Sequence, residues 1–225
     1  NDLIKEKICR AFAIAPDKII VHPNGVDLLQ FDGVSSKEEA RHRYDLPQDR
    51  SIVLYAGKCY PWKGLEILRE TAFLTPQIYF CFVGATRDEF TRATARNSLP
   101  SNLVFTGERS YHEMPHWLAT ADVTLLGGTK SNDYSYFHTS PMKLFEYMAS
   151  QKPIVAARTP ANQEIVSDKE VFFYEPDNAE DLSAKMRLAL SDRQKTSEKV
   201  EAAYEKVKRF SWQERARSIL NFMQS

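Results

Sequence analysis

Residues 138 to 150, HTSPMKLFEYMAS, place a lysine and a glutamate on a short predicted helix, a pattern that could bind a phosphorylated ligand. Ser140 can cap this helix, and Pro141 suits its first position. The free N–H groups and the positive end of the helix dipole favour an anion there. Lys143, in the first turn, is unfavourable to the dipole unless a negative group lies nearby. A bound phosphate would remove this conflict.

Glu146 lies one turn deeper in the same helix, about 5 Å along the axis from Met142. A carboxylate at this distance could accept hydrogen bonds from the ribose hydroxyls of a nucleotide whose phosphate lies at the helix end. The same spacing also allows a surface ion pair between Lys143 and Glu146. The residue types alone leave both interpretations open.

A second candidate stretch, AGKCYPWKG at residues 56 to 64, follows a predicted strand and precedes a predicted helix. Gly57 allows a ligand to approach the backbone closely, and Lys58 and Lys63 could neutralise a diphosphate. The stretch has neither the Walker A order of residues nor the G-x-G-x-x-G pattern. Two lysines in a loop are also compatible with simple solvation. Trp62 is interpreted either as a packing anchor or as a wall of the ligand site.

The sequence offers no clear metal ligands. No clustered carboxylate pair such as D-x-D occurs, so the lysines and the helix end would have to take the place of a divalent cation. His112 and His116 have the spacing of a zinc pair, but no third ligand supports them and Pro115 lies between them. We therefore predict no metal site and no cofactor.

These candidate residues need a scaffold that brings distant loops together, and the chain from Ser51 onward predicts one. Short apolar runs (SIVLYAG, YFCFVG, LVFTG, VTLLGG, PIVAA and VFFYEP) alternate with helical segments (GLEILRETAFL, DEFTRATARNS, MPHWLATA, PMKLFEYMAS and DLSAKMRLALS). Such runs suit strands covered on both faces, and helical crossovers make neighbouring strands parallel. The prediction is an α/β fold with a doubly wound, Rossmann-like parallel sheet and C-terminal helices. Glycines that end four runs mark the ligand-binding edge, at Gly57, Gly84, Gly107 and Gly127.

Charge and cysteine content exclude several classes of function. Thirty basic and thirty acidic side chains cancel in this chain of 225 residues, so no global field favours nucleic acid or an acidic membrane. Cys9, Cys59 and Cys81 are far apart, which is typical of free thiols in a cytoplasmic protein. No apolar run is long enough to span a bilayer.

The two ends of the chain are predicted to be helical. The opening stretch, NDLIKEKICRAFAIAPDKI, begins as if inside something larger, so an upstream domain is expected. Asn24-Gly25 is interpreted as a turn. Ser211 offers an N-cap for a last helix. The apolar stripe of that helix is expected to pack, in part against the upstream domain, and comprises Trp212, Ala216, Ile219, Leu220 and Met223.

In order and spacing, a series of motifs resembles the C-terminal, nucleotide-sugar-binding half of the retaining glycosyltransferases of family 4, which have the GT-B fold. The motifs are VHPNGVDLLQF, GKCYPWKG, NLVFTGERS, LATADVTLL, SPMKLFEYMASQKPIVA, NQEIV and FFYEPDNAEDLSAKM. They cover nearly the whole chain. Each is weak alone, and their order makes the resemblance specific.

The resemblance implies a role for each candidate residue. Lys58, in place of the family's usual arginine, and Lys63 would bind the leaving diphosphate and act in catalysis. Glu146 would hold the ribose, and His138 stands where the family has the glutamate that contacts the donor sugar. The remaining nucleotide-binding residues implied by the motifs are Gly57, Arg109 at the base edge, Thr139, Ser140, Pro141, Met142, Lys143 and Leu144.

The resemblance and the residue pattern together predict the donor-binding domain of a retaining, metal-independent glycosyltransferase that uses a nucleoside-diphosphate sugar of UDP or GDP type. Residues 1–27 would be a linker helix and lead-in segment from a missing N-terminal acceptor domain, 28–192 the donor domain and 193–225 C-terminal helices. The full-length protein would be cytoplasmic, with peripheral membrane association left open, and this fragment alone would be inactive. The alternatives are a GT-B nucleotide-sugar epimerase or phosphorylase, a non-catalytic nucleotide-binding module and a flavodoxin-like electron carrier.

Overall fold

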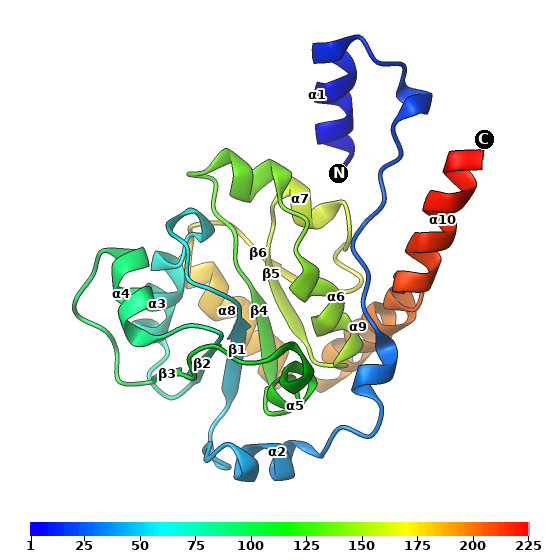
Figure 1. Ribbon diagram of the computed structural model, residues 1–225. Coiled ribbons are helices and arrows are strands. Elements are labelled where there is room, and N and C mark those ends of the chain that lie inside the picture. Colours follow the sequence, from blue (N-terminus) through cyan, green and yellow to red (C-terminus); the bar gives the residue numbers. More distant parts are fainter. Residues whose placement is uncertain (225) are drawn as a thin grey trace.

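The protein is built around one parallel sheet of six strands, in the order β3-β2-β1-β4-β5-β6 (Figure 1). The structure is a computed structural model and describes residues 1–224. The strands are β1 (Ile52–Ala56), β2 (Tyr79–Val83), β3 (Leu103–Phe105), β4 (Val123–Leu126), β5 (Ile154–Ala157) and β6 (Phe172–Tyr174). Each coincides with one of the predicted apolar runs, and every pairing is parallel. The predicted Rossmann-like sheet is confirmed.

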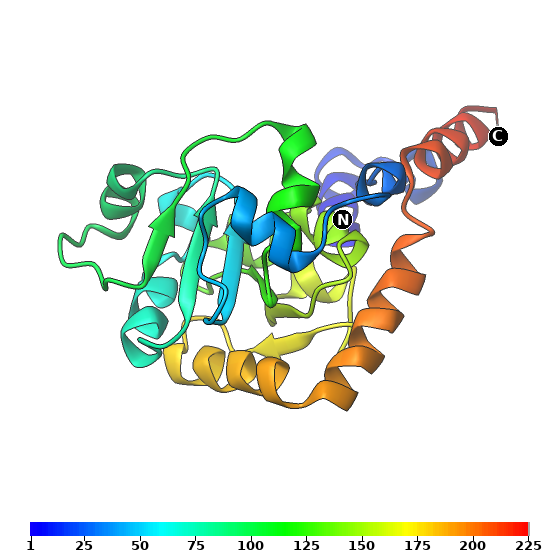
Figure 2. The same ribbon diagram turned by 90° about the horizontal axis from the view of Figure 1, so that it is seen from below.

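Two hydrophobic cores lie on opposite faces of the sheet, and successive strand residues enter them in turn. In β1, Ile52 and Leu54 belong to one core, whereas Val53 and Tyr55 belong to the other. Because both sets are buried, the strands show no alternation of apolar and polar residues. Figure 2 shows α5 and α8 on opposite sides of the sheet.

Helices on each face contribute to the core beneath them. The first core includes side chains from α5 (Met114–Ala119), α6 (Met142–Ala149) and α9 (Arg193–Val207). The second includes side chains from α3 (Glu66–Leu74), α4 (Arg87–Thr94) and α8 (Ala179–Ser191). All six of these helices overlap predicted helical segments, although α4 and α8 begin earlier than predicted, at Arg87 and Ala179. The sheet is therefore doubly wound, as the sequence predicted.

Two further helices, α2 (Lys37–Arg43) and α7 (Pro160–Gln163), were not predicted. A capping box starts α2, in which the Ser36 side chain accepts from the Glu39 N–H and the Glu39 carboxylate accepts from the Ser36 N–H. The buried Arg41 guanidinium then joins α2 to the sheet through an ion pair of 2.6 Å with Asp122. The capping-box spacing could have revealed α2 in the sequence.

The helices at the two ends, α1 (Asp2–Phe12) and α10 (Trp212–Gln224), project beyond the layered body (Figure 1). Ser211 caps α10 as predicted, because its hydroxyl accepts from the Glu214 N–H at 3.1 Å. Neither helix contains a buried residue. Within the predicted apolar stripe, Leu220 is 57% exposed and Met223 is 76% exposed. The stripe is therefore largely unpacked in this chain.

The lead-in segment runs from α1 past α10 to the body, and Asn24-Gly25 lies in it without forming a turn. The predicted turn is wrong. A Cβ added to Gly25 would lie 3.0 Å from the Trp212 backbone nitrogen, so glycine is needed here for close approach. The adjacent Val26 N–H donates to the Phe210 carbonyl at 2.9 Å.

Candidate functional site

A pocket of about 400 Å³ opens where the strand order reverses, between the carboxyl ends of β1 and β4. Ligands of open α/β sheets bind at such a switch point. The pocket is lined by Tyr55, Ala56, Gly57, Trp62, Lys63, Met114, Leu126, Gly127, Tyr134, Ser135, Thr139, Ser140, Pro141, Met142, Lys143, Glu146 and Asn162. These residues come from loops that are far apart in the sequence, including both candidate stretches.

Gly57 allows two lysines to converge at the end of β1. Its φ of 125° lies in a region that side chains disfavour, and a Cβ there would lie 3.0 Å from Lys143 Nζ and 3.6 Å from Lys63 Nζ. The two ammonium groups therefore face the same point of the pocket wall. Two basic side chains this close form a natural binding site for a phosphate or diphosphate.

Lys63 is held by its own loop, in the 3-10 helix Pro61–Lys63. Its ammonium donates to the Lys58 carbonyl at 2.8 Å and lies 5.4 Å from the centre of the Trp62 ring. Burial lowers the pKa of Lys63. Lys58 instead turns outward, where its half-exposed ammonium lies 3.4 Å from Glu108. Only one of the two predicted loop lysines lines the pocket.

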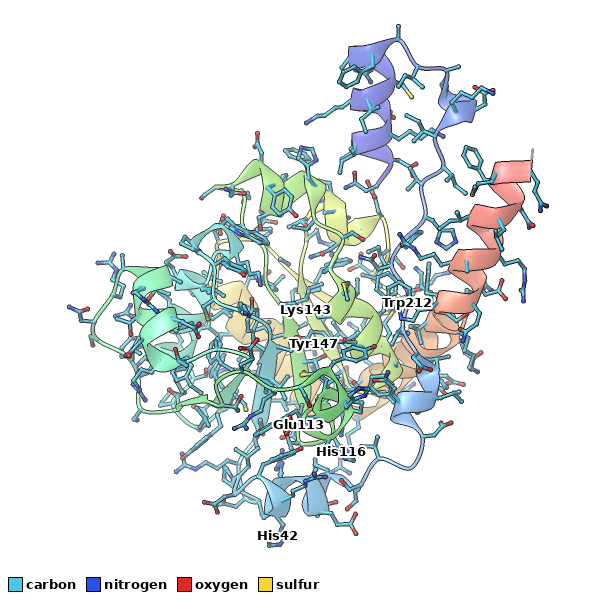
Figure 3. The ribbon with its side chains drawn as sticks, viewed as in Figure 1. His42, Glu113, His116, Lys143, Tyr147 and Trp212 are labelled. Carbon is cyan, nitrogen blue, oxygen red and sulfur yellow. The ribbon has the colours of Figure 1, made fainter. Side chains whose placement is uncertain are left out.

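Tyr147 fixes α6 against the edge of the sheet. Its hydroxyl accepts from the Ala56 N–H at 2.9 Å and donates to the Leu125 carbonyl at 3.4 Å, so it joins α6 to the ends of both β1 and β4. Figure 3 shows Tyr147 and Lys143 near the middle of the molecule, where α6 meets the sheet. Leu144, predicted to contact phosphate, is fully buried in the core.

The N-terminus of α6 begins one residue later than predicted. Pro141 is the N-cap, and the first helical residue is Met142. Ser140 does not cap, because its hydroxyl and carbonyl both accept from the Asn24 side chain, at 3.2 and 3.0 Å. The lead-in segment therefore holds the loop that enters α6. Thr139 to Lys143 nevertheless line the pocket, as predicted.

Lys143 and Glu146 are both partly buried, and burial disfavours the charged form of each side chain. Burial places the pKa of Lys143 well below its usual range, the charge of Lys63 lowers it further, and Glu146 partly opposes these effects. Burial raises the pKa of Glu146, against the influence of Lys143. The two side chains form no direct ion pair, and no hydrogen bond from the described residues reaches the Glu146 carboxylate. The alternative of a surface ion pair is therefore wrong for this structure.

His138 and Arg109 lie outside the lining of the pocket. His138 ends the π-helical turn Tyr134–His138, and its Nε2 atom is 2.9 Å from the Lys7 ammonium of α1. The Arg109 guanidinium lies 5.3 Å from the centre of the Trp117 ring. Like Lys58 and Leu144, neither residue lines the pocket.

Several lining residues were not predicted. Tyr134 lies edge-on to Trp62, with ring centres 5.0 Å apart, and both residues line the pocket. Tyr134 falls in the stretch TKSNDYSYF, which carries no motif. Asn162 donates to the Ala157 carbonyl at 2.8 Å and belongs to the motif NQEIV, which could have revealed it.

Other predictions concern metals, thiols and the membrane. In residues 1–224, no group of three or more His, Cys, Asp and Glu side chains could hold a metal ion. His112 lies in the 3-10 helix Tyr111–Glu113 and His116 in α5. Cys9, Cys59 and Cys81 are free. Among the helices of the described part of the chain, none has the length and apolar character needed to cross a bilayer.

Known proteins resemble this chain in both sequence and structure. A family model described as glycosyl transferases group 1 matches residues 36–207. Sulfoquinovosyl transferase SQD2 of Arabidopsis thaliana is 25% identical over 223 residues, which are 97% of this chain and 42% of that protein. The crystal structure of a glycosyltransferase from Rickettsia africae ESF-5 superposes with a TM-score of 0.81 at 23% identity, covering 98% of this chain and 60% of that one.

A further solved structure that resembles this chain is described as a complex with UDP-glucose. The crystal structure of Anabaena Alr3699/HepE in complex with UDP-glucose has a TM-score of 0.73 at 21% identity and covers 89% of this chain and 56% of that one. At this level of identity, the structural similarity establishes the GT-B fold. The chain thus spans about half the length of the proteins that it matches.

Proposed function

The chain belongs to the glycosyl transferases group 1 family, and from this premise we propose that it is the donor-binding part of a retaining, metal-independent glycosyltransferase. The observation that carries the proposal is the pocket at the strand switch point, where Lys63, Lys143, the N-terminus of α6 and Glu146 meet. This combination suits a nucleoside diphosphate. Family membership removes the alternative of a flavodoxin-like electron carrier.

Each group in the pocket has a role in the proposal. Lys63 and Lys143, with the N-terminus of α6, would stabilise the negative charge that develops on the diphosphate as the glycosidic bond breaks. Because these groups can neutralise a diphosphate, the reaction would need no divalent cation. Glu146, free of protein partners among the described residues, would accept hydrogen bonds from the ribose hydroxyls.

The candidate residues that do not line the pocket have less direct roles in the proposal. Lys58 would join the phosphate site by exchanging its exposed partner Glu108 for the ligand. Arg109 would lie at the base edge, and His138 near the donor sugar. A uridine donor is favoured, because a structural neighbour is described with UDP-glucose, and a guanosine donor is the second choice.

The rest of the proposal concerns a longer protein. Since this chain corresponds to 42% of one relative and 60% of one structural neighbour, we propose that an N-terminal domain binds the acceptor and precedes residues 1–27. Residues 28–192 would form the donor domain and 193–225 the C-terminal helices. The full-length protein would act in the cytoplasm, with peripheral association to a membrane where the acceptor is a lipid.

Calorimetric titration with UDP, GDP and ADP, with and without Mg²⁺, tests the proposal. We expect one diphosphate to bind without Mg²⁺. Glu146→Ala and Lys63→Ala should each weaken binding about tenfold or more, because a charge-assisted hydrogen bond contributes about 1.5–3 kcal/mol. The exposed, distant Lys169→Ala is the matched control and should bind normally. Absence of diphosphate binding, in both the folded chain and a longer protein, would contradict the proposal.

A non-catalytic nucleotide-binding module is the second candidate, and one observation favours it. His138 contacts Lys7 and does not line the pocket, so the pocket lacks the side chain that was expected to contact the donor sugar. NMR of the longer protein with a UDP-sugar separates the two functions. Release of a product with retained anomeric configuration supports the transferase, and an altered donor sugar would indicate an epimerase. Binding without any cleavage supports the module.

A further inference from the structure

Lys143 lies in a part of the pocket that supplies little negative charge to its amine. Its Nζ is 4.2 Å from the centre of the Tyr55 ring, whose face attracts a cation, and it lies beside the Cα of Gly57, which carries no charge. The Lys63 ammonium faces the same point of that wall. Glu146, one turn along α6, makes no direct ion pair with Lys143 and so offsets only part of this repulsion.

The charged and titratable groups around Lys143 come from three elements. They are Tyr55 on β1, Cys59 and Lys63 on the loop that follows β1, and Glu146 on α6 itself. Burial raises the pKa of the Cys59 thiol to about 11, so this thiol carries no compensating charge near neutral pH. Tyr55 is buried and neutral. Glu146 is thus the one source of negative charge among these neighbours.

We propose that Lys143 couples the binding of a diphosphate to the uptake of one proton from solvent, and that this coupling sets the preference of the pocket for highly charged phosphate ligands. The inference rests on the proposed function and adds a property of the same site. In the empty pocket, the repulsion from Lys63 and the loss of hydration favour the amine. A bound diphosphate supplies negative charge beside Nζ, so the ammonium form becomes the stable one.

Linkage fixes the sign of the pH dependence. Affinity is greatest below the pKa that Lys143 has in the empty pocket. It falls by up to tenfold per pH unit between that pKa and the higher pKa of the complex, because one proton must be taken up. A nucleoside monophosphate brings less charge, so its binding should take up a smaller fraction of a proton.

Calorimetric titration with UDP in two buffers of different ionisation enthalpy tests the inference. Above about pH 7.5 the terminal phosphate is already ionised, so proton uptake reports on the protein. Titrations at several pH values above about 7.5 should show uptake of up to one proton per UDP, at pH values between the pKa of Lys143 in the empty pocket and its higher pKa in the complex. Lys143→Met should abolish the uptake and flatten the pH dependence. It should also reduce the preference for UDP over UMP by about tenfold, because one ionic contact is lost.

Lys63→Met is the matched control, since it removes a cation from the same wall and leaves Lys143 in place. This variant should bind UDP more weakly but still take up a proton. The uptake should occur at higher pH, because the charge of Lys63 no longer lowers the pKa of Lys143. Binding of UDP without proton uptake over the whole range, or uptake that persists in Lys143→Met, would overturn the inference and leave the proposed function standing. Absence of binding by any diphosphate would overturn both. Circular dichroism confirms that each variant is folded.

Discussion

At the scale of single residues, two side chains of the pocket are unfavourable in the empty protein and become favourable when a ligand binds. Lys143 and Glu146 are buried enough to shift their pKa values in opposite directions, each toward the neutral form. Such groups lower the stability of the empty fold and gain favourable contacts when a complementary ligand binds. This opposition between stability and binding can be measured at Lys143.

Lys143→Met should stabilise the empty protein while it weakens binding. Because the pKa of Lys143 is lowered on folding, the unfolded chain binds the proton more tightly. The penalty is therefore complete at low pH and disappears as pH rises toward the unfolded value of about 10.4. Near neutral pH we expect a gain of about 1 kcal/mol in the free energy of unfolding. That gain would raise Tm by roughly 2–4 °C in thermal scans.

The exposed Lys169→Met serves as the control and should leave Tm unchanged at every pH. The difference between the Lys143 variant and the unsubstituted protein should shrink as the scans move to higher pH. A Lys143→Met protein that is less stable than the original near neutral pH would show that the lysine is structurally required. The burial of Lys143 would then be explained by the stability of the fold and not by ligand binding.

At the scale of elements, Tyr147 determines where the N-terminus of α6 lies. Tyr147→Phe removes the acceptor of the buried Ala56 N–H and should lower the free energy of unfolding by about 1–3 kcal/mol in urea titrations. UDP affinity should fall as well, because α6 carries both Lys143 and Glu146. Tyr204→Phe, a partly buried tyrosine on α9, is the matched control. Equal losses for the two variants would contradict a positioning role for Tyr147.

At the scale of the whole molecule, the sheet and the helices beside it were predictable because the residue patterns that specify them lie within short segments. Each strand lies in a short, mainly apolar run, four of these runs end in glycine, and each predicted helix has a regular period. The pocket needed contacts between distant segments. Ser140 fails to cap α6 because Asn24 occupies it, and the sequence around neither residue signals this contact.

The same reason explains why other side chains at the site lie where the sequence pattern did not predict. Lys58 and Lys63 have the same type and lie in one loop, yet only Lys63 faces the pocket, since the 3-10 helix Pro61–Lys63 turns it inward. Tyr134 lies on a π-helical turn for which the sequence carries no signal. His138 was assigned by a resemblance in spacing, whereas α1 determines its contact with Lys7.

The exposed apolar face of α10 leads to a prediction about the longer protein. Leu220 and Met223 contribute little to this chain because they lie mainly in solvent. Leu220→Gln combined with Met223→Gln should therefore change its free energy of unfolding by less than about 0.5 kcal/mol. If α10 packs against an N-terminal domain, the same pair should destabilise the longer protein by about 2–3 kcal/mol.

Urea titrations of both proteins measure this difference, with Arg217→Gln on the same helix as the control that should change neither. Because the two proteins share α10, an effect confined to the longer one identifies burial against the added domain as the cause. Equal and small effects in both would mean that α10 stays exposed in the longer protein. Its apolar residues would then be available to another surface, and a domain that closes over the pocket would have to dock elsewhere on this chain.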